Sequence, residues 1–243
     1  MAGSELVDYE KVAKLYGKGR ALPDDVLARW GAAVHPHLPA GPLRVADVGA
    51  GTGIFAAAWP VWGADTVVAV EVAEAMAREG RAAAPYALGQ AEALPLATGS
   101  LDVVWMSATF HHFADQTAAV TEIDRVLRPD GVVLIRSLLA DRTASGWFGD
   151  FFPGSERALA RALRLDALAG LFGHRGFTVR HVEEVPDLQT SCGEAADWVE
   201  RMRHADSLLT ALTDDEVAAG VRRLRATSGK RAPLDISLVV LGR

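Results

Sequence analysis

Between residues 43 and 138, short apolar runs rich in β-branched side chains alternate with alanine-rich segments of helical spacing. The runs predict strands at residues 43–48, 66–70, 101–106 and 131–135, with a weaker one at 85–89. Helices are expected between them, at 54–62, 73–83 and 116–127. Such alternation builds βα units, and strands with nearly continuous apolar runs need helices on both faces. The pattern therefore predicts an α/β fold around a central, mostly parallel sheet.

After residue 139 the pattern is looser. A helix is expected near residues 156–172, a strand at 177–185, a mostly helical stretch at about 193–226 and a final strand at 234–241. The sequence has no internal repeat and no low-complexity linker. We therefore expect one domain, residues 1–243, in which the 193–226 stretch is an insertion.

Charge balance and cysteine content limit the partners and the compartment. The 243 residues include 25 Lys and Arg and 31 Asp and Glu, a net charge of −6, which argues against nucleic acid as a partner. The single cysteine, Cys192, allows no internal disulfide and no thiolate metal cage. The N-terminal segment lacks the apolar core of a signal peptide, and no apolar run is long enough to span a membrane. A cytoplasmic protein without membrane attachment is the expectation.

A glycine-rich turn follows the first predicted strand, in the segment VADVGAGTG at residues 45–53. Glycines there allow a tight turn and let a ligand approach the backbone. The spacing is GxGxG, and Ile54 stands where dinucleotide sites have a third glycine. Asp47, two residues before the first glycine, would repel a phosphate and attract a cation. These features favour a positive or zwitterionic ligand over a pyrophosphate.

Acidic and amide side chains follow the next two predicted strands. Glu71 follows the second strand, where nucleoside-binding folds place an acid against the ribose hydroxyls. A carboxylate suits a vicinal diol because it can accept both hydroxyl protons. Gln90 and Glu92, beside the small Ala91, are placed to contact the edge of an adenine. Together they predict a nucleoside site above the glycine turn.

Four segments in order, VADVGAGTG, VVAVEVAEAM, GQAEALPLATGSLDVVWMSATFHHF and EIDRVLRPDGVVLI, resemble the class I S-adenosylmethionine-dependent methyltransferases. The resemblance is to the small-molecule branch, typified by the ubiquinone/menaquinone and trans-aconitate methyltransferases, and covers residues 40–138 closely. It implies a Rossmann-like, seven-stranded, mostly parallel sheet with an antiparallel last strand and a helical cap. It further implies transfer of a methyl group from S-adenosylmethionine to a small organic acceptor, which leaves S-adenosylhomocysteine.

The resemblance also assigns residues and segments. It divides the chain into N-terminal lid helices at 1–39, a cofactor-binding core at 40–138, a substrate-side segment at 139–176, and the last strands with their insertion at 177–243. The implied contacts with the methionine moiety of the cofactor are Asp47, Gly49, Ala50, Gly51 and Gly53, and the implied ribose contact is Glu71. Residues expected near the adenine are Val72, Met76, Gln90, Ala91 and Glu92. Ser107 and Ala108 are expected on the reacting side, and Tyr16 and Arg20, with Tyr9, in the lid.

Two groups of side chains could act on the acceptor. His111 and His112 follow the fourth strand, where an imidazole could deprotonate a hydroxyl or amine, although loop packing would equally explain them. Adjacent histidines diverge and no third ligand stands at metal-binding spacing, so no metal site is expected. Trp147, Phe148, Phe151 and Phe152 are candidates for an apolar substrate wall, with buried packing beneath a cap as the alternative.

The sequence leaves several alternatives open. O-, N- and C-methylation are not separated, because no residue dictates the nucleophile. A protein that binds S-adenosylmethionine but carries out a non-methylating reaction, or that has no catalytic role, would keep the same motifs. An NAD-dependent dehydrogenase is disfavoured by Ile54 and Asp47. The expected partner is a small-molecule acceptor, as in secondary metabolism, and the chain is expected to be a monomer or homodimer.

Overall fold

The computed structural model describes residues 22–82, 84–142, 147–227 and 229–243. At its centre is a seven-stranded sheet in the order β3-β2-β1-β4-β5-β7-β6. The strands are β1 (Arg44–Val48), β2 (Thr66–Glu71), β3 (Tyr86–Leu88), β4 (Leu101–Ser107), β5 (Leu127–Ser137), β6 (Thr178–Ser191) and β7 (Arg231–Gly242). Strands β1 to β5 pair in parallel, and β7 is antiparallel to both β5 and β6. The predicted Rossmann-like sheet with an antiparallel last strand is confirmed.

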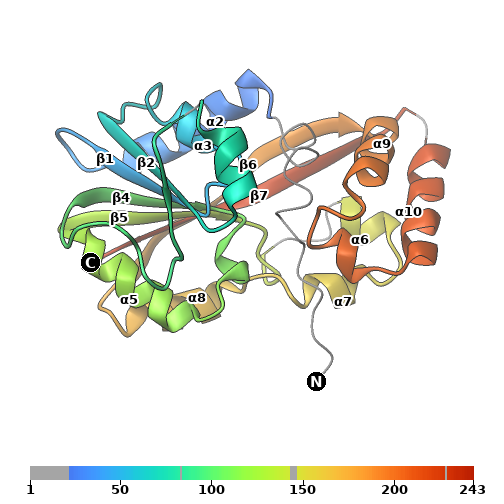
Figure 1. Cartoon of the computed structure of the whole chain (residues 1–243). Coiled ribbons are helices and arrows are strands. Elements are labelled where there is room, and N and C mark those ends of the chain that lie inside the picture. Colours follow the sequence, from blue (N-terminus) through green and yellow to red (C-terminus); the bar gives the residue numbers. More distant parts are fainter. Residues whose placement is uncertain (1–21, 83, 143–146, 228) are drawn as a thin grey trace.

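Helices cover both faces of this sheet, as the continuous apolar strands require (Figure 1). One face packs against α2 (Asp24–Val34) and α3 (Ile54–Ala58), and the other against α5 (Gln116–Val126) and α8 (Leu165–Gly173). Alternate residues of each strand enter opposite cores. In β1, Val45 joins the α2 and α3 side, whereas Ala46 and Val48 join the other. Helix α4 (Glu74–Gly80) follows β2 and buries Met76.

The α2 and α3 face has an aromatic core. The Trp105 ring, on β4, has its centroid 5.1 to 6.0 Å from those of Phe55, Trp30, Trp59 and Trp62. Several of these pairs are edge-to-face, the arrangement that aromatic quadrupoles favour. The packing fixes α2 and α3 over β4 and its neighbour β1, which ends at the glycine turn.

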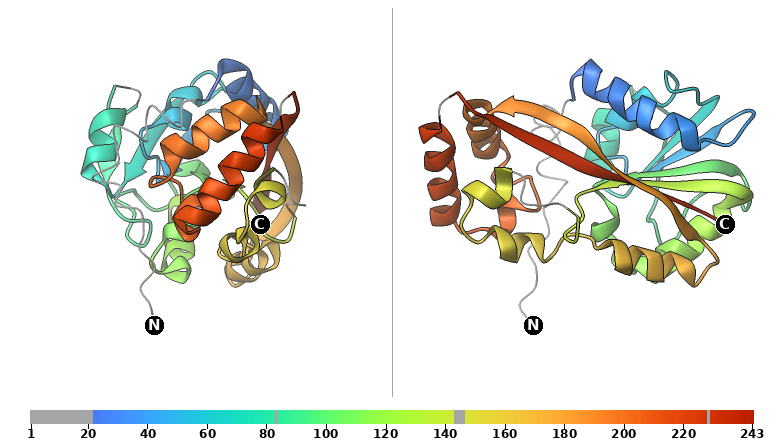
Figure 2. Two further views of the ribbon diagram at one scale, coloured as in Figure 1. Left: turned by 90° about the vertical axis from the view of Figure 1, so that its right-hand side faces the viewer. Right: turned by 180° about the vertical axis from the view of Figure 1, so that it is seen from behind.

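A helical cap lies beyond the carboxyl ends of the parallel strands (Figures 1 and 2). Its helices are α6 (Trp147–Phe151), α7 (Ser155–Leu159), α9 (Cys192–Met202) and α10 (Asp214–Ala226). They enclose an apolar core of their own, which includes Phe152, Val199 and Leu224. Strands β6 and β7 extend beyond the main sheet and connect it to the cap (Figure 2). Among the described residues, no helix combines the length and the apolar character that crossing a bilayer demands.

The element bounds depart from the sequence prediction where tertiary contacts intervene. The expected single helix at 156–172 is wrong, because α7 ends at Leu159 and α8 begins at Leu165. Between them Leu163 forms a bridge with Leu139, and its carbonyl accepts from the Ala140 amide at 2.8 Å. The strand expected at 177–185 continues to Ser191, since it pairs with β7 along its whole length.

Candidate functional site

The glycine turn connects β1 to α3 and folds over the end of β2. The amides of Gly49 and Ala50 donate to the Val70 carbonyl at 2.8 and 3.1 Å. Gly49, Gly51 and Gly53 have φ angles of +71°, +57° and +80°, which side-chain-bearing residues adopt only with strain. A Cβ atom on Gly49 would overlap the Thr109 side chain. The turn therefore needs glycine both for its conformation and for its close contact with the segment after β4.

Two buried carboxyl groups face each other beside this turn. Asp47 is 1% exposed and Glu71 is 8% exposed. Burial, and then the charge of Glu71, raises the pKa of Asp47 to about 8, although a hydrogen bond from the Ala56 amide opposes the shift. Neither carboxylate forms an ion pair with any residue that the structure describes. A bound cation would stabilise this pair of carboxyl groups, and the sequence predicts a ligand that carries a positive charge.

Glu71 also holds the turn in place. One of its oxygens accepts from the Gly51 amide at 2.8 Å, and the other from the Val72 and Ala73 amides at 2.9 Å each. The Tyr86 hydroxyl donates to the Gly51 carbonyl at 3.1 Å. Burial, with Asp47 and Glu71 adding to it, raises the pKa of the Tyr86 hydroxyl and keeps it a donor. A carboxylate oxygen has two acceptor positions, so Glu71 Oε2 retains capacity for a ligand hydroxyl.

The residues expected near an adenine separate into exposed and buried ones. Val72 is an apolar side chain with 64% exposure, at the end of β2. Met76 and Ala91 are buried. Gln90 is exposed, and Glu92 accepts from the Asp115 amide at 3.1 Å, so it also supports the start of α5. Val72 and Gln90 are therefore the residues of this group best placed to meet a base.

At the end of β4, Ser107 and the following Ala108 form hydrogen bonds to the neighbouring strand β5. Ala108 has a φ angle of +52°, rare for a residue with a side chain, and its amide donates to the Arg136 carbonyl at 2.7 Å. The Arg136 guanidinium donates to Ser107 Oγ at 3.2 Å. The unusual backbone at Ala108 is thus held by β5, at the carboxyl edge where the resemblance places the reacting side of the cofactor.

Arg136 belongs to a buried network that the sequence analysis missed. Its guanidinium donates to Asp187 Oδ1 at 2.6 and 3.2 Å, and the Trp30 indole N–H donates to the same oxygen at 2.7 Å. The guanidinium carbon also lies 5.1 Å from the centroid of the Trp30 ring. The sequence does contain a signal for Arg136, because this charged residue directly follows the apolar run at 131–135. A charged side chain at the end of a buried strand is itself buried only when it has a partner of opposite charge.

The predicted histidine pair contacts the cap. His111 and His112 lie in the short helix η2 (Phe110–His112), with ring centroids 4.0 Å apart. His111 Nε2 is 3.4 Å from Ser207 Oγ, in the segment that follows α9. The structure therefore brings the end of β4 and the cap together at this imidazole, which suits either a closing contact or a base.

The predicted aromatic wall lies inside the cap. Phe148 and Phe152 are buried and stacked, with centroids 5.2 Å apart, and Phe151 is half-buried. Phe148 and Phe152 are therefore packed as the alternative expectation describes, in the apolar interior of the cap. The Trp147 side chain, and all of Tyr9, Tyr16 and Arg20, lie outside the described residues.

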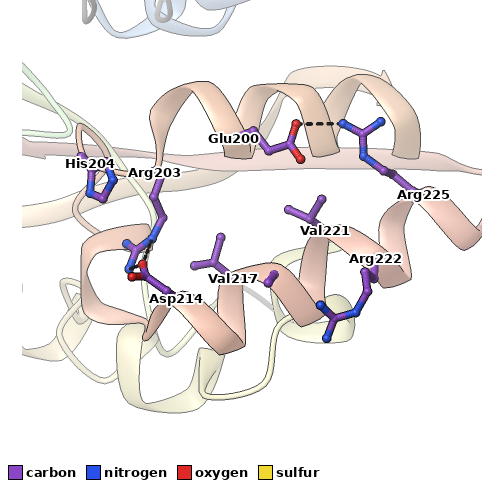
Figure 3. Close-up of a pocket in the computed structure, with 9 residues that line it drawn as sticks. Glu200, Arg203, His204, Asp214, Val217, Val221, Arg222 and Arg225 are labelled. Carbon is purple, nitrogen blue, oxygen red and sulfur yellow. Dashed lines mark hydrogen bonds and ion pairs between the residues drawn. The ribbon is translucent and has the colours of Figure 1, made fainter.

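A separate pocket of about 530 Å³ lies between α9 and α10 (Figure 3). Its charged residues are largely paired with one another. Arg225 bonds to Glu200 at 2.8 Å, and Arg203 to Asp214 at 2.9 Å. All of its lining residues belong to the cap segments 200–204 and 214–225, so the pocket is distinct from the glycine turn.

Comparison with known proteins identifies the family. A methyltransferase-domain family model matches residues 46–135. The chain is 33% identical to the malonyl-[acyl-carrier protein] O-methyltransferase of Enterobacter lignolyticus over 180 residues, 69% of this chain and 70% of that protein. The chain belongs to the class I S-adenosylmethionine-dependent methyltransferases. Further curated relatives named for the same reaction or for biotin synthesis are matched over 28% to 51% of their own length.

Solved structures share the fold of this methyltransferase. A protein described as a methyltransferase of an antibiotic biosynthesis pathway in Anabaena variabilis has a TM-score of 0.70 and 22% identity, over 93% of this chain and 99% of that one. The [4+2]-cyclase SpnF has a TM-score of 0.66 and 16% identity, over 96% and 92%. The cofactor of the family is S-adenosylmethionine, and the buried Asp47–Glu71 pair beside the glycine turn fits its positive charge and ribose hydroxyls.

Proposed function

We propose that this methyltransferase methylates a small organic acceptor that binds between the carboxyl edge of the sheet and the helical cap. The observation that carries the proposal is the buried pair Asp47 and Glu71 at the glycine turn. This turn follows the carboxyl end of β1, and the cap lies beyond the same end of the parallel strands (Figure 1). Asp47 would hold the cationic amino group, the turn amides the carboxylate, and Glu71 the ribose. When bound, S-adenosylmethionine supplies an electrophilic methyl group, which leaves sulfur as the new bond to the acceptor forms.

The residues of this chain contribute mainly by positioning. Holding the nucleophile in line with the methyl carbon, about 3 to 3.5 Å away, supplies much of the rate enhancement in displacements of this kind. The buried Arg136 supports Ser107 and Ala108 on the reacting side. The contact between His111 and Ser207 would close the cap over the acceptor and exclude water.

We further propose a carboxylate as the first acceptor class to test. The relatives named as malonyl-[acyl-carrier protein] O-methyltransferases support this choice. A carboxylate is already ionised at neutral pH, so its oxygen attacks without a general base. A hydroxyl or amine acceptor would need to lose a proton, and His111 or His112 would then be the base.

The test is an incubation of the full chain with isotopically methyl-labelled S-adenosylmethionine and malonyl-acyl carrier protein, with free diacids and simple phenols and amines in parallel. We expect a labelled product one methylene heavier, together with S-adenosylhomocysteine. The Asp47→Ala variant is the matched negative control, because it should bind the cofactor poorly. Transfer to a hydroxyl or amine only would overturn the carboxylate assignment and keep methyl transfer.

The fold shared with the [4+2]-cyclase makes a non-methylating reaction the competing function. It would appear in the same experiment as conversion of the acceptor with no change of mass and no S-adenosylhomocysteine. Cofactor binding without any conversion across the acceptor panel would instead favour a non-catalytic role.

A further inference from the structure

Two histidines and a glutamate, all half-buried, meet beside β6, the edge strand of the sheet. His37 lies in the short helix η1 (His35–His37), directly after α2, and His181 and Glu183 lie near the start of β6. One ligand atom from each residue lies within 4.8 Å of the other two. The His37 and His181 rings have centroids 4.6 Å apart, and His181 Nε2 is 3.7 Å from Glu183 Oε1.

The fold explains why these residues converge although they are far apart in the sequence. His181 and Glu183 are two positions apart on β6, and they pair with Val240 and Leu238 of β7, both in the core beneath α2. Residues two apart share a face of a strand, so both side chains point to the side that α2 covers. Helix α2 crosses that side and ends in η1, which brings His37 above them.

We propose that His37, His181 and Glu183 form a binding site for a divalent first-row transition ion such as Zn²⁺. Imidazole and carboxylate together select Zn²⁺, Ni²⁺ or Cu²⁺ over Mg²⁺ and Ca²⁺, which prefer all-oxygen sites. In a tetrahedral zinc site with bonds of 2.0 to 2.1 Å, ligand atoms lie about 3.3 Å apart. The 3.7 Å between His181 and Glu183 is already close to that value.

The electrostatic environment of His37 reflects the two residues beside it. Partial burial, and then the neighbouring His181, lowers the pKa of His37, while Glu183 opposes the shift. A cation bound by both imidazoles and by the Glu183 carboxylate would stabilise this close arrangement.

The site's location indicates a structural role. Midway along its length, α2 is fastened to β6 by a hydrogen bond from Arg29 to the Pro186 carbonyl at 2.9 Å and by the bond from Trp30 to Asp187. An ion on His37, His181 and Glu183 would also fasten the carboxyl end of α2 to the same strand. Because β6 is the edge strand of the sheet, such a clip would also protect an exposed edge. The expectation of no metal site rested on the His111–His112 pair, and no local pattern in the sequence connects His37 with His181, 144 positions away.

The experiment uses the full chain without a histidine tag, stripped of metal by a chelator and titrated with Zn²⁺ and Co²⁺ in a calorimeter, with Mg²⁺ as the negative ion. We expect one Zn²⁺ per chain, a visible Co²⁺ spectrum and a rise in the thermal unfolding midpoint. His37→Ala and Glu183→Gln should each weaken binding roughly tenfold or more. His35→Ala is the matched control, since it removes an exposed imidazole from the same short helix, and should bind within about twofold of the parent.

Equal Zn²⁺ affinity in the parent, His37→Ala and Glu183→Gln proteins would overturn the proposal. So would binding that His111→Ala abolishes and His37→Ala does not, since the ion would then sit on the other histidine pair. The folding of each variant is checked by circular dichroism before titration. Binding of S-adenosylhomocysteine is measured separately and is expected to be the same in His37→Ala and the parent, so the outcome is independent of the proposed function.

Discussion

Asp47 has almost no contact with solvent, and the groups that act on it electrostatically are the Glu71 carboxylate, the Ala56 amide and the Tyr86 hydroxyl. Its pKa of about 8 lies above its ordinary value of 3.8. The folded protein therefore holds a proton, between about pH 4 and pH 8, that the unfolded chain has released. The contribution of Asp47 to stability is present below this window and is lost as pH rises through it.

The same carboxyl group makes cofactor binding depend on pH. A cationic ligand binds ionised Asp47, so at pH 7 binding should release a proton. We expect the dissociation constant for S-adenosylhomocysteine to fall roughly eightfold between pH 6.5 and 7.5, as the ionised fraction of a group with a pKa of about 8 rises. Calorimetry in buffers of different ionisation enthalpy measures both the affinity and the released proton.

Two controls isolate Asp47 in that experiment. Asp47→Asn keeps the shape of the side chain but cannot ionise, so its weaker binding should not change over this pH range. Adenosine lacks the amino acid moiety and should bind the parent protein with no pH dependence. Parallel pH profiles for the parent and Asp47→Asn proteins would show that Asp47 is not the charge partner.

At the scale of elements, the β1–α3 turn combines a strained backbone with a binding role. Gly51 has a φ angle of +57° and donates its amide to Glu71, whereas Gly63 has a φ angle of +105° with nothing within 4 Å of an added Cβ atom. Gly51→Val and Gly63→Val should each lower the free energy of unfolding by about 1 to 3 kcal/mol, the usual strain at such backbone angles.

Only the change in the β1–α3 turn should affect the cofactor. Gly51→Val places a branched side chain where the ligand approaches the backbone, so we expect no measurable binding of S-adenosylmethionine. Gly63→Val should bind like the parent. Urea unfolding and calorimetry measure the two effects separately, and normal binding by folded Gly51→Val would mean that the cofactor does not lie over this turn.

The sequence predicted the elements and residues whose signal is local. The strand runs and the GxGxG turn are local patterns, and the predicted parallel core was confirmed. Asp47 and Glu71 are indicated by where they stand relative to the predicted strands, although Glu71 is 20 positions from its partner Gly51. The break between α7 and α8 was missed because it depends on the bridge from Leu163 to Leu139. No spacing rule indicates such a bridge in advance.

At the scale of the whole molecule, the buried Arg136–Asp187 pair joins separate parts of the chain. Arg136 lies on β5 and Asp187 on β6, with Trp30 of α2 on the same carboxylate and Ser107 of β4 on the same guanidinium. The paired residues are 51 positions apart and meet only because β7 is inserted between β5 and β6. The sequence signals that Arg136 needs a buried partner, but it does not indicate Asp187 as that partner, since the pairing requires the complete strand order.

Removing one partner of this pair should be far more costly than removing both. Asp187→Ala leaves the Arg136 guanidinium buried without a counter-charge, and we expect the free energy of unfolding to fall by about 3 to 5 kcal/mol. The double variant Arg136→Met/Asp187→Leu replaces the pair with apolar side chains and should recover much of that loss, because neither charge then has to be buried.

Urea unfolding of the parent, both single variants and the double variant gives the coupling between the two residues. Asp166→Ala, which breaks the exposed pair with Arg164, is the matched control and should cause no measurable change. If the double variant is destabilised by the sum of the two single effects, the two side chains act independently and the network does not join these strands.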